Sequence, residues 1–261
     1  QRRDLYWTNS IKHNKKNKTI EYKNAWLNVY DFPLIYFPYF YHPDPTVKRQ
    51  SGFLLPKLSN SSTLGNSLQI PYYKVISENK DLTLSPKIFF DDNILIQTEY
   101  RQKNKNSELI TDQSINFNDN STRSHFFGNF KTSTETSEYQ INLESTSNKN
   151  YLKKYEVVSP LIDDNMNLNS FISFEKDFDD SYFSTSFEVF EDLTKDDTDS
   201  YEYIYPNYYF NKQINSNKPG SLEFSTSGYQ KKYDTSKYDA VVVNDIKYRS
   251  LQNISRKGSI N

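Results

Sequence analysis

From about residue 66 onward, apolar and polar residues alternate one by one along most of the chain. Between Ile94 and Arg101 the even positions hold Ile, Ile, Thr and Tyr, whereas Gln97, Glu99 and Arg101 occupy odd positions. The same alternation recurs at 139–143, 183–189 and 222–226. Because successive side chains of a β-strand point to opposite faces, the pattern predicts strands with one apolar and one polar face.

Short polar clusters separate these alternating runs. They are rich in Asn, Asp, Ser and Lys and fall at 78–81, 91–93, 118–120 and 147–150. Such residues favour tight turns, because their side chains bond nearby backbone groups or tolerate left-handed φ values. About ten strands of roughly 8–12 residues fit from Leu68 onward, close to the ~9–11 residues of a tilted membrane strand. We therefore expect an antiparallel meander.

The apolar content of the chain is mostly aromatic. The 261 residues include 22 Tyr and 18 Phe against six Gly, and the mean hydropathy is −0.86. A water-soluble core usually relies on Leu, Val, Ile and Ala, and a disordered chain would have few aromatics. A transmembrane barrel fits both numbers, because its strands need apolar residues only on the lipid side and its rims collect aromatics.

Several classes of protein are excluded by simple counts. A net charge of −1 argues against a duplex nucleic-acid binder. The absence of Cys excludes disulfides and thiolate metal sites. No apolar run reaches the ~18 residues of a transmembrane helix. The only methionine is Met166 and no apolar segment opens the chain, so we expect an excerpt or a mature fragment.

The first 43 residues follow a different pattern. Three strands are expected, at Leu5–Ile11, Lys18–Tyr30 and Pro33–Tyr41. The third contains Leu34 to Phe40, which is apolar on both faces, so we expect it to be enclosed on both sides. The region reads as part of a small sandwich that is cut off at its N-terminal end.

No arrangement of residues typical of catalysis or metal binding stands out. His13, His42 and His125 are far apart, and ordinary surface or rim histidines are expected. The acidic pairs at 91–92, 163–164 and 196–197 lack the spacing of a calcium loop. There is no Ser/His/Asp set, no pair of catalytic carboxylates and no glycine-rich phosphate loop. We therefore predict no catalytic residue, no metal and no cofactor.

Two prolines fall inside strand patterns on either side of one turn. Pro71 lies within 68–73 and Pro86 within 82–88. A proline cannot donate to the ladder and is normally confined to edges or bulges. Two on consecutive strands would place weak pairing side by side, which could make a barrel seam openable. The alternative is a pair of tolerated prolines in a sandwich.

A series of motifs then resembles a known family in order and spacing. They are Tyr36 to Phe40, the stretch KRQSGFLLP at 48–56, Pro71 to Tyr73, Asp81 to Pro86, and Glu99 to Arg101. Together they resemble the outer-membrane LPS-assembly protein family (LptD/OstA), most specifically between residues 18 and 101. The cysteines that some members use for interdomain disulfides are absent here.

The resemblance implies an all-β fold in two parts. Residues 1–43 would form the end of a periplasmic β-jelly-roll, 44–66 a crossing, and 67–261 the first antiparallel transmembrane strands of an incomplete outer-membrane β-barrel. The protein would lie in the cell outer membrane with its N-terminal part in the periplasm. Its partners would be lipopolysaccharide, the plug lipoprotein of the translocon and a periplasmic jelly-roll bridge protein.

The implied function is transport of lipopolysaccharide to the outer leaflet, with no covalent chemistry. Acyl chains would travel in the jelly-roll groove and leave through a lateral gate in the barrel. Three groups of residues would serve this path: the groove with Ile20, Tyr22, Leu27, Val29, Ile35 and Phe37; the crossing with Pro43, Arg49, Ser51, Gly52, Phe53 and Pro56; and the gate with Pro71 and Pro86.

Two other classes of function compete with this one. A secreted β-sandwich could bind carbohydrate through exposed aromatics, and a general porin or an outer-membrane enzyme could use the same strands. A porin needs neither a leading jelly roll nor a proline pair on adjacent strands. A soluble sandwich should stay dispersed without detergent.

Overall fold

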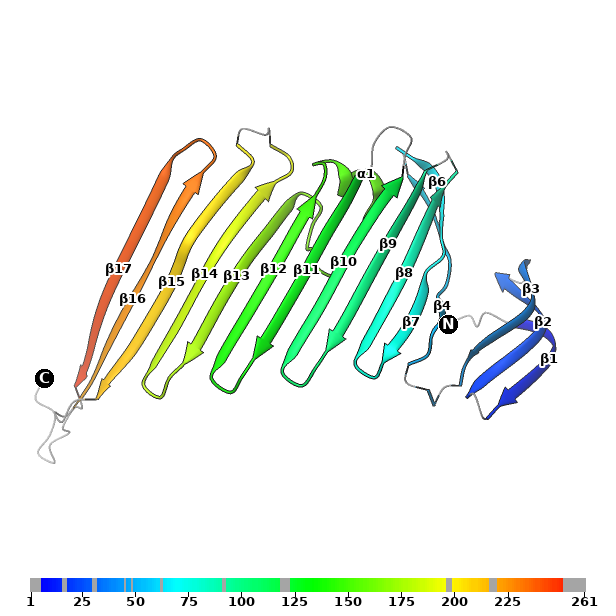
Figure 1. The fold of residues 1–261 in the computed structure, drawn as a ribbon, viewed down its shortest axis with the longest axis horizontal. Helices are drawn as coiled ribbons and strands as arrows, with labels where there is room; N and C mark the ends of the chain where they lie inside the picture. The colour runs from blue at the N-terminus through cyan, green and yellow to red at the C-terminus, as the bar shows by residue number, and fades with distance from the viewer. Residues whose placement is uncertain are drawn as a thin grey trace, which may run out of the picture.

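The computed structural model is built from two antiparallel sheets (Figure 1). It describes residues 6–15, 18–29, 32–44, 46–47, 49–61, 63–90, 93–117, 123–195, 199–215 and 220–250. One sheet has three strands and the other has 14. The all-β prediction is confirmed, and among the described residues the larger sheet remains open rather than closing into a barrel.

The small sheet has the strand order β1–β2–β3. Its strands are β1 (Tyr6–Asn14), β2 (Thr19–Val29) and β3 (Phe32–Pro43), close to the three predicted ranges. The expectation that β3 is enclosed on both sides is wrong for the described residues. Tyr36, Tyr39 and Tyr41 are exposed, Tyr39 to 51%. Their hydroxyl groups allow these side chains to meet water.

The large sheet is a meander over most of its length. Its first strands are β4 (Gly52–Phe53), β5 (Lys57–Ser61), β6 (Gly65–Gln69) and β7 (Tyr72–Ser77). Ten longer strands follow: β8 (Lys80–Phe89), β9 (Ile94–Lys103), β10 (Ser107–Phe117), β11 (Arg123–Ser133), β12 (Ser137–Thr146), β13 (Asn167–Asp177), β14 (Ser181–Asp192), β15 (Tyr201–Asn215), β16 (Gly220–Tyr233) and β17 (Tyr238–Ser250). From β8 to β17 each strand pairs with the next one along the chain.

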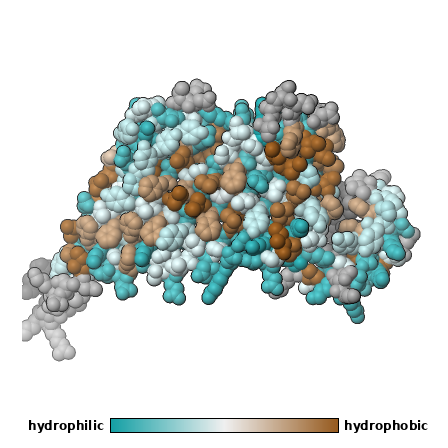
Figure 2. All heavy atoms as spheres, viewed as in Figure 1, coloured by the Kyte–Doolittle hydropathy of each residue, from teal (hydrophilic) through white to brown (hydrophobic). Residues whose placement is uncertain are grey.

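The register gives the large sheet one apolar and one polar face. Phe130, Ile141, Ile172 and Phe187 lie directly opposite one another on four neighbouring strands and are all exposed. The next row on the other face is polar and consists of Lys131, Gln140, Ser173 and Ser186. Figure 2 shows apolar residues in a band across the strands, with hydrophilic residues along the lower turns.

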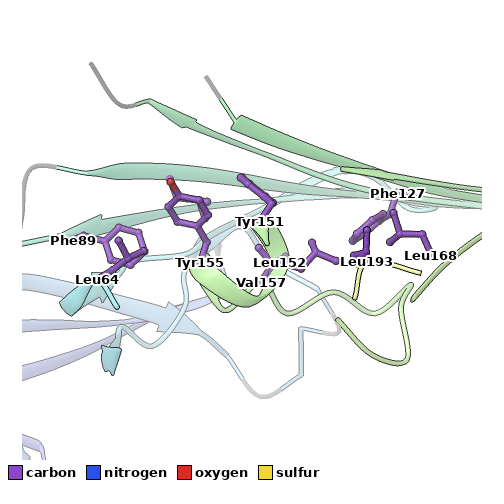
Figure 3. Close-up of a cluster of buried hydrophobic side chains, with 10 residues drawn as sticks. Leu64, Phe89, Phe127, Tyr151, Leu152, Tyr155, Val157, Leu168 and Leu193 are labelled. Atoms are coloured by element: carbon purple, nitrogen blue, oxygen red, sulfur yellow. The ribbon is translucent and has the colours of Figure 1, made fainter. Parts of the chain in front are cut away.

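The polar face carries a short helix that the sequence did not predict. Helix α1 (Tyr151–Tyr155) ends at Glu156, whose φ of 50° is left-handed, a common way for a helix to stop. Tyr151, Leu152 and Tyr155 are buried against Phe89 and Phe127 of the sheet (Figure 3). Five residues are too few for a helical period to show in the sequence. Among the described residues, no helix has the length and apolarity needed to cross a membrane.

Candidate functional site

The segment after the small sheet docks on the edge of the large one. Gly52 pairs with Tyr73 and Phe53 with Tyr72, so the segment adds the short strand β4 to the edge of β7. The backbone N–H of Val75 donates to Ser51 Oγ at 2.8 Å. Gly52 and Phe53, predicted as crossing residues, thus form a real edge strand, and Ser51 extends its contact with β7.

Arg49 holds the start of this docked segment through three groups. Its Nε donates to Tyr73 OH at 3.0 Å and its Nη1 to the backbone oxygen of Glu78 at 2.8 Å. Its Nη2 forms an ion pair with Asp81. Arg101 Nε donates to the other oxygen of Asp81 at 2.8 Å. Arg49, Glu78, Asp81 and Arg101 line a cleft of about 410 Å³ together with Asn79, Lys103 and Glu108.

Pro86 faces Ile70, the residue before Pro71, and only Pro86 is inside a strand. Pro71 sits in the break between β6 and β7, so its placement within a strand was wrong. Ile70 N–H donates to the carbonyl oxygen of Pro86 at 3.1 Å, and Leu54 N–H to that of Pro71 at 2.8 Å. Neither proline has an N–H to return the bond, so both pairs are held from one side only.

The break at Pro71 marks a change of neighbour at the edge. Above it β6 pairs with β5, and below it β7 pairs with β4. The outermost strands of this end are therefore β4 and β5, not the strand pair that flanks Pro71. Pro56 lies in the gap between them, next to Lys57, which is opposite Gln69. The edge thus carries a proline at the same level as the Ile70–Pro86 pair.

The edge strands β4 and β5 and the residues between them expose apolar side chains. Phe53, Leu55 and Leu58 are 74–75% exposed. Phe53 packs edge-on against Tyr72 with 5.0 Å between ring centroids. Figure 2 shows strongly apolar residues gathered at the end of the sheet where Figure 1 places β6 and β7.

The residues predicted for the groove lie on β2 and β3 of the small sheet. Phe40 contacts Tyr22 at 5.9 Å and Phe37 at 5.6 Å between ring centroids. Ile20, Tyr22 and Phe37 are half-buried, and Ala25, opposite Phe37, is buried. For Leu27, Val29, Ile35 and Pro43 only the backbone is described; Leu27 pairs with Ile35, and Thr19 with Pro43. Tyr22 and Phe37 therefore both contact the Phe40 ring.

Asn24 lies on β2 between Tyr22 and Trp26. It has a φ of 52°, in the left-handed region that interrupts regular alternation. Tyr36 OH donates to its side-chain oxygen at 2.6 Å. Beyond this residue, Trp26 and Tyr36 form a separate exposed pair with centroids 5.0 Å apart.

A buried polar network under α1 was not visible in the sequence. Ser114 Oγ lies 2.6 Å from His125 Nδ1 and shares a second hydrogen bond of 2.6 Å with Tyr151 OH. His125 Nε2 is 3.7 Å from Asp112 Oδ1. The expectation of a surface histidine was wrong here, because His125 is 3% exposed. Burial raises the pKa of Tyr151 to about 12.

This Ser–His–Asp grouping does not form a catalytic centre. Ser114 and Asp112 are 4% and 0% exposed, and Tyr151 covers the hydroxyl that would have to attack. The distance from His125 to Asp112 also exceeds that of a hydrogen bond. A nucleophile needs open space about 3 Å away for the reacting atom. The network instead fixes α1 to β10 and β11.

Further hydrogen bonds tie α1 to β10 and β8. Tyr155 OH donates to Asn116 Oδ1 at 2.8 Å. Lys87 Nζ, next in sequence to Pro86, donates to the backbone oxygen of Tyr155 at 3.1 Å. A lysine at the last carbonyls of a helix also interacts favourably with the helix dipole. The segment on the polar face is therefore attached to β8 itself.

Fold and site together define an all-β protein whose long sheet is apolar on one face and polar on the other. A segment that follows the small aromatic sheet pairs with the edge of this long sheet. No family model matches the chain. Over about a third of its length, however, the chain is homologous to the LPS-assembly protein LptD.

The homologous relatives are bacterial. LptD of Pseudomonas aeruginosa strain UCBPP-PA14 is 38% identical over 107 residues, which cover 40% of this chain and 12% of that protein. LptD of Pseudomonas entomophila strain L48 is 44% identical over 85 residues, which cover 33% of this chain and 9% of that protein. LptD of Ectopseudomonas mendocina strain ymp is also 44% identical over 85 residues. The chain thus spans about a tenth of the length of the curated relatives it matches.

Proposed function

We propose that the chain is part of an outer-membrane protein that transports lipopolysaccharide to the outer leaflet. The observation that carries this proposal is the homology to LptD in a chain whose long sheet has an exposed apolar row on one face. Phe130, Ile141, Ile172 and Phe187 make that row continuous over four strands. Soluble monomers rarely expose such contiguous apolar surface.

In this proposal the large sheet is the first part of a transmembrane β-barrel. The apolar face contacts lipid and the polar face, with α1 on it, faces the lumen. Residues 67–261 belong to the barrel, and residues 1–43 to a periplasmic jelly roll. Part of the predicted crossing at 44–66 joins the barrel sheet as β4, β5 and the start of β6. Ion pairs on the polar face, such as Lys131–Glu138 at 2.6 Å, fit a water-filled interior.

The lipid path begins in the small sheet. The half-buried side chains of Ile20, Tyr22 and Phe37 contact the acyl chains, together with Leu27, Val29 and Ile35. The segment from Pro43 through Arg49, Ser51, Gly52 and Phe53 to Pro56 connects this groove to the sheet edge. The protein carries out no covalent step and needs no cofactor.

Pro71 and Pro86 form part of the lateral gate. Each leaves one strand pair with a single bond where two are normal. A backbone carbonyl without a hydrogen-bond donor destabilises a protein in hydrocarbon by several kcal/mol. A missing hydrogen bond between two barrel strands is therefore expected where those strands have to separate. Lipopolysaccharide passes between this edge and the last barrel strand, with a plug lipoprotein and a periplasmic jelly-roll bridge protein as partners.

The double substitution Pro71→Val and Pro86→Val in the full-length protein tests the gate. It should lower lipopolysaccharide at the cell surface while the protein still inserts at normal levels. Unchanged export at normal protein levels would remove the gate role and leave two tolerated breaks. Loss of barrel assembly would assign the prolines to folding instead.

A further inference from the structure

Asp81 lies where the crossing segment, the turn between β7 and β8, and strand β9 meet. Its side chain is buried and is contacted by Arg49 at one oxygen and Arg101 at the other. A buried carboxylate is stable only when its lone pairs are matched, and removing one partner leaves an uncompensated charge. Asp81 is thus a fixed anchor to which the crossing segment is attached.

Arg49 makes contacts that a lysine could not make together. Its guanidinium reaches Tyr73 on β7, the backbone oxygen of Glu78 in the turn, and Asp81 on β8. Three acceptors around one rigid plane fix the orientation of that plane as well as its position. Arg49 therefore attaches the crossing segment to β7, to the following turn and to β8 at the same time.

The upstream end of the same segment is tied to the small sheet. The N–H of Asp44 donates to the Lys18 backbone oxygen at 2.9 Å. Its carboxylate accepts from the Thr46 N–H at 2.8 Å and from the Thr46 hydroxyl at 2.7 Å. The ties at Asp44 and Arg49 are only five positions apart, a span of at most about 18 Å. The two sheets are joined by a short link fixed at both ends.

We propose that Arg49 is a positioning residue that aligns the groove of the small sheet with the apolar edge at Phe53, Leu55 and Leu58. The inference rests on the proposed lipid transport. Phe53 lies four residues beyond Arg49 in the segment that Ser51 and β4 hold against β7. A lipid that leaves the groove meets exposed apolar side chains only if this link keeps its direction.

The test compares lipid capture at two places in the full-length protein in cells. One photoreactive residue replaces Phe37 in the groove and another replaces Leu58 at the edge. Arg49→Gln should lower the ratio of lipopolysaccharide captured at Leu58 to that at Phe37 by about fivefold or more, as the loss of a charged hydrogen bond implies. Arg49→Lys should give an intermediate ratio. This variant provides the test if Arg49→Gln does not fold.

Lys103→Gln is the matched control. Lys103 lines the same cleft, and among the described residues its ammonium pairs with Glu108 on β10, at 3.1 Å, rather than with the crossing segment. Its removal should leave the capture ratio unchanged. An unchanged ratio in both Arg49 variants, with normal amounts of protein, would overturn the positioning role.

Hydrogen exchange at Val75 separates failure of this inference from failure of the proposed function. The Val75 amide is bonded to Ser51 Oγ only while the segment is docked. Faster exchange in Arg49→Gln than in Lys103→Gln supports the link even if the parent protein captures no lipid. Equal exchange in the two variants would show that Arg49 does not hold the segment.

Discussion

The backbone N–H of Ile70 donates to the carbonyl oxygen of Pro86 at 3.1 Å, and Pro86 cannot return the bond. Facing residues of an antiparallel ladder normally exchange two bonds in such a pair. Leu54 and Pro71 repeat the arrangement one strand further out, at 2.8 Å. The missing donor of Pro86 points toward Ile70 and that of Pro71 toward Leu54. Two successive strand pairs are therefore weakened at one level.

This geometry separates the effects of the two prolines. Pro86→Val supplies an N–H directed at Ile70 and should stabilise the contact of β8 with its outer neighbour by about 0.5–1.5 kcal/mol. Pro71→Val supplies one directed at Leu54 and should stabilise only the outermost edge. Hydrogen exchange in detergent should show slower exchange at Ile70 in the first variant and at Leu54 in the second. The reverse pattern would contradict the assignment.

Arginine substitutions on neighbouring residues of β13 test which face of the sheet meets lipid. Ile172 is exposed in the apolar row, whereas Ser173 lies in the polar row. Ile172→Arg should destabilise the protein in bilayers by about 2–4 kcal/mol if the row lies near the membrane midplane. Ser173→Arg, the control, should change stability far less. Equal unfolding free energies for the two variants would exclude the proposed membrane orientation.

The packing of α1 can be tested by a pair of truncations. Leu152 is fully buried between the helix and the sheet, whereas Val158 is 82% exposed. Leu152→Ala should cost about 2–5 kcal/mol, because it removes apolar contacts and leaves a cavity. Val158→Ala should be close to neutral. Denaturant titration of both variants measures this difference, and similar costs would show that α1 does not pack as described.

Tyr151 should make stability depend on pH in the alkaline range. Burial raises its pKa from 10.0 to about 12. A phenol that ionises less readily in the folded state stabilises the protein below its unfolded pKa. That contribution is lost as pH rises from about 10 to about 12. Unfolding free energies should fall more steeply over this interval in the parent than in Tyr151→Phe. Parallel curves would mean that Tyr151 is not held as an un-ionised buried phenol.

The regular part of the fold could be predicted because its cause is local. Alternation at Ile94 to Arg101 placed Gln97, Glu99 and Arg101 on one face, and β9 has them on the polar face with Asp112. The polar cluster at 78–81 likewise marked the turn between β7 and β8, whereas 147–150 leads into α1, and 91–92 and 118–120 lie outside the described residues. Period-two alternation and turn-forming residues are properties of short stretches of sequence, so they can be recognised without knowledge of the tertiary structure.

The irregular parts depend on contacts between distant residues. Helix α1 forms because Tyr151 and Tyr155 are buried against Phe89 and Phe127, which lie far away in the sequence. His125 was expected at the surface because no residue near it in the sequence indicates that Tyr151 of α1 will cover it. Arg49 was identified as a crossing residue, but its partner Asp81 could be found only once the strands were placed.

Photocrosslinking in the groove tests the central claim of lipid transport most directly. Photoreactive residues replace Tyr22 and Phe37, which share contact with Phe40, and Tyr39, which is exposed elsewhere on β3. Burial of acyl chains against apolar side chains should yield about 25 cal/mol per Å² only on the groove side. The account predicts lipopolysaccharide attached at positions 22 and 37 in living cells and little at 39. Equal capture at all three positions, or capture at 39 alone, would contradict it.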